Sequence, residues 1–327
     1  MDKRVEESEF NCSSNRMKLE FSNTNLEKMM AEKYSESKLE DIFDGYEVEV
    51  AGRQFFLISN RVRADLKIPE KEWGRKVILS NLKLVPGIGE ATERLLKEQG
   101  YDTIEDLLHH PRFGIEALRL LELLEDGVNP SLIQLMDRRF PKSHPARLHL
   151  SCLCDKEEFT FMDIETMGLS GQPIILIGVA KLEGSRVLVN QYLARNYEEE
   201  PGILSAFMSY SEDVLVTFNG SSFDIPYLSY RMSCHGLGTV TGRAHFDILV
   251  FSKRVWRDEL PNLRLSTLER YILGLEREDD IPSFLVPHLY RKYLETNNIG
   301  LLVPVIQHNR QDIVSMMGLF SKLFEEF

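Results

Sequence analysis

From about residue 147 to the C-terminus, apolar runs of strand length alternate with helical patterns, and this alternation limits the folds open to the chain. The segments EEFTFMDIE, PIILIGVAKL and RVLVNQYL predict three successive strands joined by short turns. A helix at GILSAFMSY then leads to a strand at DVLVTFN, a helix at DIPYLSYRMSCHG and a short strand at AHFDI. Because strands that alternate with helices are typical of α/β proteins, we predict an α/β domain at residues 147–327 with a five-stranded sheet flanked by helices.

The residues before this domain divide into three parts. Residues 1–37 are polar with few large apolar groups, which predicts a flexible arm. Residues 38–75 contain YEVEVAG and RQFFLISNRV around a glycine turn, which predicts a short strand-rich segment. Residues 76–140 have helical periodicity interrupted by one sharp turn, and a proline-containing linker follows them.

The composition is that of an ordinary globular protein. The 327 residues are 43% hydrophobic, without a membrane-length apolar run and without an apolar core in the charged start MDKRVEESEF. The net charge of −12 does not favour general nucleic-acid binding, although clustered carboxylates that hold metal ions add negative charge of this kind. Cys152 and Cys154 lack a second Cys/His pair at zinc-site spacing, so we expect them to be small buried residues. We expect a soluble, cytoplasmic protein with no membrane partner.

Two acidic residues share one face of a predicted strand. Asp163 and Glu165 in FMDIETMGL are two positions apart, while Ile164 between them points into the core. Two carboxylates held together repel each other unless a cation lies between them, and paired oxygen ligands suit Mg²⁺ or Mn²⁺. The alternative interpretation is an exposed strand face with two solvated acids.

Two later segments place further acids near element ends. In LVTFNGSSFDIPYL an apolar strand runs into a turn, and Asp224 stands at a helix start, where an aspartate is often only a cap. In IQHNRQDIVSM, His308 and Asp312 are one helical turn apart on one face, as they would also be in a merely exposed helical pair. Each segment alone favours the structural interpretation, but the ordered set of acids does not.

In this order of acids the sequence resembles the DEDD, or DnaQ-like, exonucleases, and more closely the YprB-type ribonuclease H-like domain. HFDILVFSKRVW, LSTLERYILGLEREDDIP and HNRQDIVSM match that family's pattern, and the resemblance covers roughly residues 147–326. It implies a ribonuclease H-like mixed sheet and two-metal hydrolysis of phosphodiester bonds of DNA or RNA, from a free 3′ end, with Mg²⁺ or Mn²⁺ as the two ions. The implied metal ligands and catalytic acids are Asp163, Glu165, Asp224 and Asp312.

The resemblance is less direct for the remaining polar residues. Relatives with a catalytic histidine usually place it five residues before the final aspartate, whereas His308 lies four before Asp312, at the spacing of relatives with tyrosine. We treat His308 as a candidate general base whose role is not carried over directly. Asp247 in HFDIL matches the family pattern outside the four acids and is expected to be structural or to act through neighbours. Asn219 and Ser222 are candidates for lining the nucleotide pocket.

The segment LKLVPGIGEATERLLKEQGYDTIEDL resembles a helix-hairpin-helix. Gly87 and Gly89 permit a tight turn and a close approach of backbone to phosphate. The amides of residues 88–90 open a helix whose N-terminus favours an anion, so the module would contact the nucleic-acid backbone without reading sequence. The expected packing face is Leu84, Ile88, Leu95 and Leu96.

The charge of this module is mixed. Nearby positive charge comes from Lys83, Arg94 and Lys97, while Glu90 and Glu93 lower the expected affinity. The alternative interpretation is an αα-hairpin used for packing or protein contact. A further basic stretch, SKRVWRDELPNLRLSTLER, offers a phosphate track with Trp256 as a stacking ring, or a solvated helix face over a buried tryptophan.

Three functions remain open from the sequence. The first is a 3′→5′ exonuclease acting on DNA or RNA. The second is a nucleic-acid-binding or scaffold protein with an inactive nuclease fold, which the complete set of acids disfavours. The third is a ribonuclease H-like endonuclease, which shares the fold and the metal chemistry.

Overall fold

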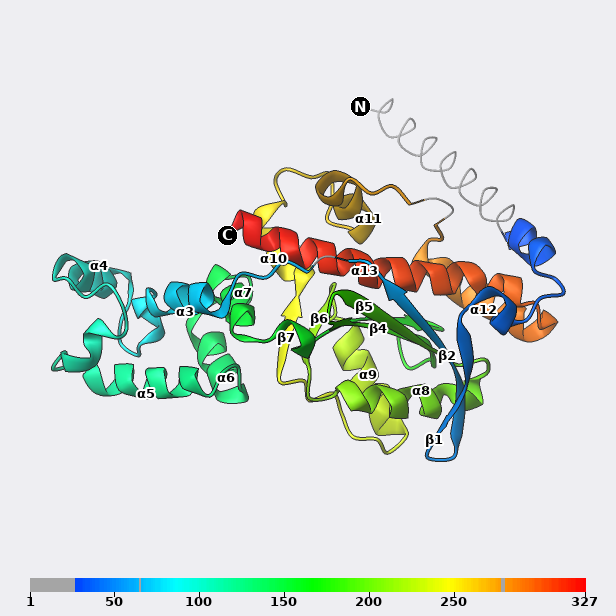
Figure 1. Cartoon of the computed structure of the whole chain (residues 1–327), viewed down its shortest axis with the longest axis horizontal. Coiled ribbons are helices and arrows are strands. Elements are labelled where there is room, and N and C mark those ends of the chain that lie inside the picture. The colour runs from blue at the N-terminus through cyan, green and yellow to red at the C-terminus, as the bar shows by residue number, and fades with distance from the viewer. Residues whose placement is uncertain (1–26, 65, 278–279) are drawn as a thin grey trace, which may run out of the picture.

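A seven-stranded mixed sheet lies at the centre of the protein, whose computed structural model describes residues 27–64, 66–277 and 280–327 (Figure 1). The strand order is β1-β2-β5-β4-β3-β6-β7. The antiparallel neighbours are β1–β2, β2–β5, β5–β4 and β4–β3, whereas β3, β6 and β7 run parallel. The strands are β1 Gly45–Val50, β2 Arg53–Val62, β3 Phe159–Thr166, β4 Ile174–Glu183, β5 Arg186–Leu193, β6 Val214–Thr217 and β7 Ala244–Asp247.

The α/β prediction is confirmed, but the predicted number of five strands is wrong. All five expected strands are present, and the strand-rich segment supplies two more, because β2 pairs with β5 from Phe56↔Leu193 to Val62↔Val187. The physical reason is that β5 would otherwise be an edge strand with unpaired backbone groups. The hairpin also brings Phe55, Phe56 and Ile58 into the core.

Helices cover both faces of the sheet. Figure 1 shows the long α13 across one face and α8 and α9 on the other. Alternation along β3 divides its side chains, since Phe161 packs on the α13 side while Met162 and Ile164 pack with α8 and α9. The helices of this part are α8 Glu200–Phe207, α9 Asp224–Cys234, α10 Ile248–Val255, α11 Leu265–Leu268, α12 Val286–Thr296 and α13 Val303–Glu326.

A group of helices extends from the β7 end of the sheet (Figure 1). It begins at Lys71 and contains the turn at residues 85–89 expected for the hairpin. Its buried side chains join those under α10 and α13 in one continuous core, which includes Cys152 and Cys154. Its helices are α3 Lys71–Leu79, α4 Glu90–Glu98, α5 Gly114–Glu125, α6 Pro130–Arg139 and α7 Pro145–His149.

The segment expected to be a flexible arm lies mostly outside the described residues. Its described end is helical at residues 27–33 and docks near α12, with Met30 buried and the Ala31 carbonyl accepting a hydrogen bond from Asn298 Nδ2 (2.9 Å). The short helix α2 Leu39–Ile42 then leads into β1. Among the described residues, no helix has both the length and the apolar composition needed to cross a bilayer.

Candidate nuclease active site

Four carboxylates and one histidine line a single cavity of about 450 Å³. Asp163 and Glu165 come from β3, Asp224 from the start of α9, and His308 and Asp312 from α13. Three of these five side chains are buried: Glu165, Asp224 and His308. The fold therefore brings together residues that are up to 149 positions apart in the sequence, between Asp163 and Asp312.

The place of α13 over β3 depends on one small residue. Gly178 on β4 is the register partner of Asp163, and a Cβ atom there would lie 2.1 Å from Asn309 Oδ1 and 2.2 Å from Ile313. Asn309 is fully buried and donates from Nδ2 to Asp163 Oδ2 (2.8 Å), while its Oδ1 accepts from Gln191 Nε2 (2.8 Å). Gly178 thus lets α13 approach closely enough for Asn309 to orient Asp163.

Asp247 fixes the loop that precedes Asp224. Its Oδ1 accepts from the backbone amides of Asn219 (2.8 Å) and Leu249 (3.1 Å), and its Oδ2 accepts from the Ser221 amide (3.1 Å) and the Ser221 hydroxyl. Asn219 has a left-handed backbone conformation (φ 66°), in which asparagine is tolerated better than most residues. Asn219 lines the cavity, whereas Ser222 is exposed and is not among the lining residues.

The carboxylates raise one another's pKa values. Burial raises the pKa of Asp163 well above its usual range, and the charges of Asp312, Glu165 and Asp224 raise it further. Burial and the charges of Asp312 and Asp224 do the same for Glu165. Burial raises the pKa of Asp224 to about 7, although hydrogen bonds from backbone amides oppose the shift. The cluster is therefore a site where ionised acids lack sufficient compensating positive charge.

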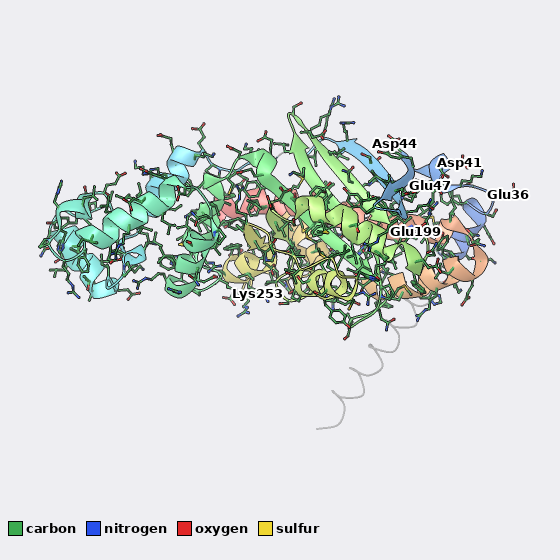
Figure 2. All side chains as sticks on the ribbon, turned by 90° about the horizontal axis from the view of Figure 1, so that it is seen from below. Glu36, Asp41, Asp44, Glu47, Glu199 and Lys253 are labelled. Carbon is green, nitrogen blue, oxygen red and sulfur yellow. The ribbon has the colours of Figure 1, made fainter. Side chains whose placement is uncertain are left out.

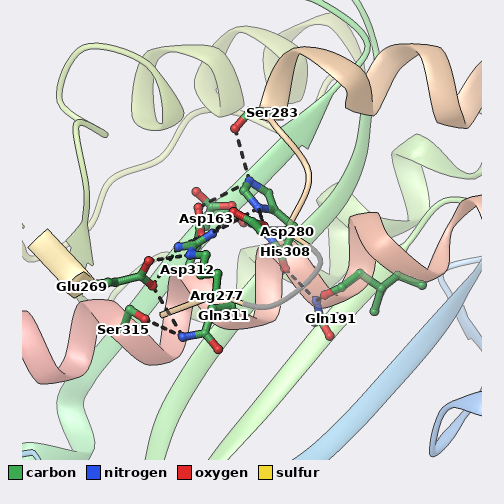
Figure 3. Close-up of polar contacts among 12 residues, drawn as sticks. Asp163, Gln191, Glu269, Arg277, Asp280, Ser283, His308, Gln311, Asp312 and Ser315 are labelled. Atoms are coloured by element: carbon green, nitrogen blue, oxygen red, sulfur yellow. Dashed lines mark hydrogen bonds and ion pairs between the residues drawn. The ribbon is translucent and has the colours of Figure 1, made fainter. Parts of the chain in front are cut away.

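Arg277 brings a cation to the edge of the cluster. Figure 3 shows its guanidinium between Glu269 on one side and Asp312 with His308 on the other. Nη2 donates to Asp312 Oδ1 (2.5 Å) and to Glu269 Oε1 (2.8 Å), and Nη1 lies 3.1 Å from Asp280 Oδ2. Burial raises the pKa of Asp312, while His308 and Arg277 hold the rise in check.

His308 is held by a carboxylate of its own. Its Nδ1 lies 2.7 Å from Asp280 Oδ1, its Nε2 lies 3.2 Å from Ser283 Oγ and 3.8 Å from Asp312 Oδ2. Burial alone would lower the pKa of His308, but the hydrogen bond to Asp280 and the charges of Asp312 and Asp280 raise it above the usual value. Because ionised Asp280 only accepts, Nδ1 is the donor in this pair.

The donor chemistry of the cavity fits a hard divalent cation. Several carboxylate oxygens from different elements converge on one cavity, as Mg²⁺ and Mn²⁺ require. In the part of the chain that the structure describes, no three His, Cys, Asp or Glu side chains are already gathered at metal-binding distance. Arg277 on Asp312 and Asn309 on Asp163 occupy oxygens that a cation would otherwise contact.

The predicted hairpin has a tight turn, but two of its details differ from expectation. Gly87 has φ +89°, and Leu84, Ile88 and Leu96 are buried as expected. Leu95 is 53% exposed, so its assignment to the packing face is wrong: α4 presents only one side to the core. The Ile88 amide donates to Val85 O (3.2 Å), which leaves the amides of Gly89 and Glu90 to open the helix.

The cations of the module are partly neutralised. Glu93 lies between Lys83 and Lys97, at 3.8 Å and 3.7 Å, while Arg94 is exposed. Trp256 is only 2% exposed, so it does not serve as a stacking ring, and the interpretation of a solvated basic face over a buried tryptophan is the right one for that stretch.

Several polar residues of the site were missed in the sequence. Asn309, Gln191, Arg277, Glu269 and Asp280 contact the candidate residues directly or through one another. Asn309 carried a weak signal, since it adjoins His308 in HNRQD. Glu269, Arg277 and Asp280 lie in LSTLERYILGLEREDDIP, which matched the family pattern but did not indicate a role for any of them. Gln191 gave no signal, because its partner Asn309 lies 118 residues away in the chain.

A comparison with protein families matches residues 160–324 to the RNase_H superfamily. The chain belongs to this superfamily. The uncharacterized protein YprB of Bacillus subtilis is 33% identical over 172 residues, which are 51% of this chain and 42% of YprB. DNA polymerase 1 of Pyrococcus abyssi is 26% identical over 209 residues, which are 52% of this chain and 26% of the polymerase. The chain thus spans less than half the length of these curated relatives.

Among solved structures, the family B DNA polymerase of Pyrobaculum calidifontis matches with a TM-score of 0.39 at 22% identity, covering 51% of this chain and 24% of the polymerase. Exonuclease I of E. coli, solved in complex with a dT13 oligonucleotide, matches with a TM-score of 0.31 at 13% identity, covering 46% of this chain and 42% of that chain.

Proposed function

We propose that the protein is a metal-dependent nuclease that removes nucleotides from the 3′ end of DNA or RNA. The observation that carries the proposal is the convergence of Asp163, Glu165, Asp224 and Asp312 on one cavity, with pKa values that burial raises in all four. A set of acids that destabilise one another's charge is a functional arrangement more often than a structural one. Membership of the RNase_H superfamily supports the same chemistry.

In this proposal the four acids hold two Mg²⁺ or Mn²⁺ ions. When bound, such ions neutralise the phosphodiester, lower the pKa of a water and stabilise the leaving oxygen. The chain's own residues do the rest. Asn309 orients Asp163, and Asp247 holds the loop through which Asn219 lines the cavity. His308 is near enough to Asp312 to exchange a proton with a water at this ligand.

We propose that the hairpin binds the phosphate backbone of longer substrates. Its cations, Lys83, Arg94 and Lys97, lie on the helical extension, and Gly89 leaves open space at its Cβ position. A group of acids lies at the other end of the molecule, where Arg195 pairs with two of them, Glu47 and Glu199. Figure 2 shows the acidic side chains that it labels, Glu36, Asp41, Asp44, Glu47 and Glu199, gathered around the β1 hairpin, with Lys253 apart from them toward the helical extension.

The experiment that tests the main proposal uses end-labelled DNA and RNA with the purified protein in Mn²⁺. We expect a ladder that shortens from the 3′ end, and we expect it to disappear in Asp163→Asn and Glu165→Gln, which keep the fold but remove a ligand charge. The matched control is Asp213→Asn, because Asp213 is a half-buried aspartate that pairs with Lys181 (2.6 Å) and lies outside the cavity. Cleavage by both acid variants at the wild-type rate would refute the assignment. Internal cuts in circular substrates would favour the endonuclease, and no cleavage alongside tight binding would favour the inactive binding protein.

A further inference from the structure

The guanidinium of Arg277 is anchored unusually firmly for a side chain at the edge of a cavity. Nε and Nη2 both bond to Glu269, with Nη2 at 2.8 Å from Oε1, so arginine and carboxylate meet as two parallel forks. The Arg277 side chain is 10% exposed and that of Glu269 is 0% exposed. Because removing Arg277 from this pair would leave a buried, unpaired carboxylate, the guanidinium cannot swing away at low cost.

The backbone places Glu269 for this role. It begins a π-helical turn, Glu269–Leu273, which follows α11 and ends at Gly274 in a left-handed conformation (φ 68°). Single π turns occur frequently at functional sites, because the extra residue redirects the side chains that follow. Gln311, the residue before Asp312, also reaches Glu269, with Nε2 at 3.5 Å from Oε1. Glu269 is therefore tied to α13 as well as to Arg277.

Nη1 and Nη2 of Arg277 also reach toward the cavity. Nη2 contacts Asp312 Oδ1 at 2.5 Å, and Nη1 contacts Asp280 Oδ2 at 3.1 Å. Asp312 Oδ2 takes no part in the contact with Arg277 and lies 3.8 Å from His308 Nε2. The two oxygens of Asp312 are thus distinguished: one is bound to the guanidinium, and the other is on the side of the histidine that also lines the cavity.

We propose that Arg277, braced by Glu269, is a positioning residue that fixes the carboxylate of Asp312 so that Oδ2 alone is presented to a divalent cation. The inference rests on the proposed function, in which Asp312 is a metal ligand. Hydrogen bonds from outside the ligand set commonly orient ligating carboxylates, and their loss typically weakens metal binding or activity about 10–100-fold.

Two physical effects of Arg277 have opposite signs, and this makes the role testable. Its positive charge repels an incoming cation, so charge alone predicts that losing it tightens metal binding. The planar guanidinium also orients Asp312 through a hydrogen bond, so a positioning role predicts that losing this bond weakens metal binding. Arg277→Lys separates the two effects, because lysine keeps the charge but has no planar fork to hold Glu269 and Asp312 together.

The experiment measures Mn²⁺ binding directly, by the disappearance of the free-ion electron paramagnetic resonance signal on titration into the full chain. We expect wild type to bind Mn²⁺ and Arg277→Lys to bind it about 10–100-fold more weakly. The matched control is Arg195→Lys. Arg195 forms a similar fork with Glu199, with Nη2 2.6 Å from Oε1, and neither residue lines the cavity. This control should lose stability yet keep the Mn²⁺ affinity of wild type.

A second variant covers the case in which Arg277→Lys does not fold. The double substitution Glu269→Gln with Arg277→Gln removes both charges of the buried pair, while Asp280 and Asp312 keep His308 as a neighbour, so we expect it to fold and to bind Mn²⁺ weakly. Affinity within about threefold of wild type in Arg277→Lys, or tighter binding in the double variant, would overturn the positioning role while leaving the nuclease proposal intact. Failure of wild type to bind Mn²⁺ would overturn both.

Discussion

Replacing Asp224 by asparagine should stabilise the metal-free protein at alkaline pH while removing its response to metal. Asp224 is 4% exposed, and burial raises its pKa from 3.8 to about 7. A shift of about three units corresponds to about 4 kcal/mol of free energy against the ionised form. Asparagine keeps an oxygen for the backbone amides of Asp224 and Ile164 and carries no charge, so it removes this penalty.

The sign of the pH dependence follows from linkage. Between pH 3.8 and about 7 the unfolded chain has lost the Asp224 proton while the folded chain retains it. The free energy of unfolding therefore falls as pH rises through this window and levels off above it. The gain from Asp224→Asn should be small near pH 4.5 and about 1–4 kcal/mol near pH 8, the lower part of the range applying where neighbouring acids take up the released proton.

The assay is thermal or urea unfolding in a chelator at both pH values, repeated with Mn²⁺. Asp247→Asn is the contrasting control, because that buried carboxylate accepts hydrogen bonds from three backbone amides. An amide group there faces N–H donors with its own N–H, so we expect a loss of about 1–3 kcal/mol at both pH values. Equal destabilisation by the two substitutions, without pH dependence in Asp224→Asn, would refute the argument that burial penalises the ionised form of Asp224.

Three further outcomes are expected. Gly89→Ala should fold normally, because nothing lies within 4 Å of the added Cβ and the φ of −108° suits alanine. It should nevertheless weaken the binding of long substrates and spare that of short ones. Unchanged affinity for long substrates in a gel-shift titration would show that the hairpin does not contact nucleic acid. Glu93→Gln should raise the affinity and steepen its salt dependence, because Lys83 and Lys97 lose their shared partner; a flat or shallower salt plot would contradict this. His308→Ala should keep metal binding but lower the single-turnover rate at least about 10²-fold. It should also flatten the acid limb of the pH–rate profile, which the raised pKa of His308 moves to higher pH in the wild type. A rate within about threefold of wild type would leave His308 without a catalytic role.

The sequence could predict the residues that the local backbone places together. Asp163 and Glu165 share a face because strand side chains alternate, and His308 and Asp312 share one because a helical turn separates them. The same reasoning placed all five strands between residues 159 and 247. It did not assign the hairpin at residues 45–62 to this sheet. An alternating segment indicates that one of its faces is buried, but it does not indicate which strand it pairs with.

What the local pattern could not predict is the protonation and orientation of those same residues. The sequence makes His308 a candidate general base, but it does not show that Asp280, 28 residues earlier, bonds to its Nδ1 and raises its pKa. Protonated His308 donates from both nitrogens, so it accepts a proton from water only after losing one of its own. Whether His308 can act as a base therefore depends on Asp280 and on the negative charge of Asp312, whose Oδ1 accepts a hydrogen bond from Arg277. Asp280 does not line the cavity, and its substitution should lower the pH at which His308 becomes a base. The acid limb of the wild-type profile should therefore move to lower pH in Asp280→Asn and vanish in His308→Ala.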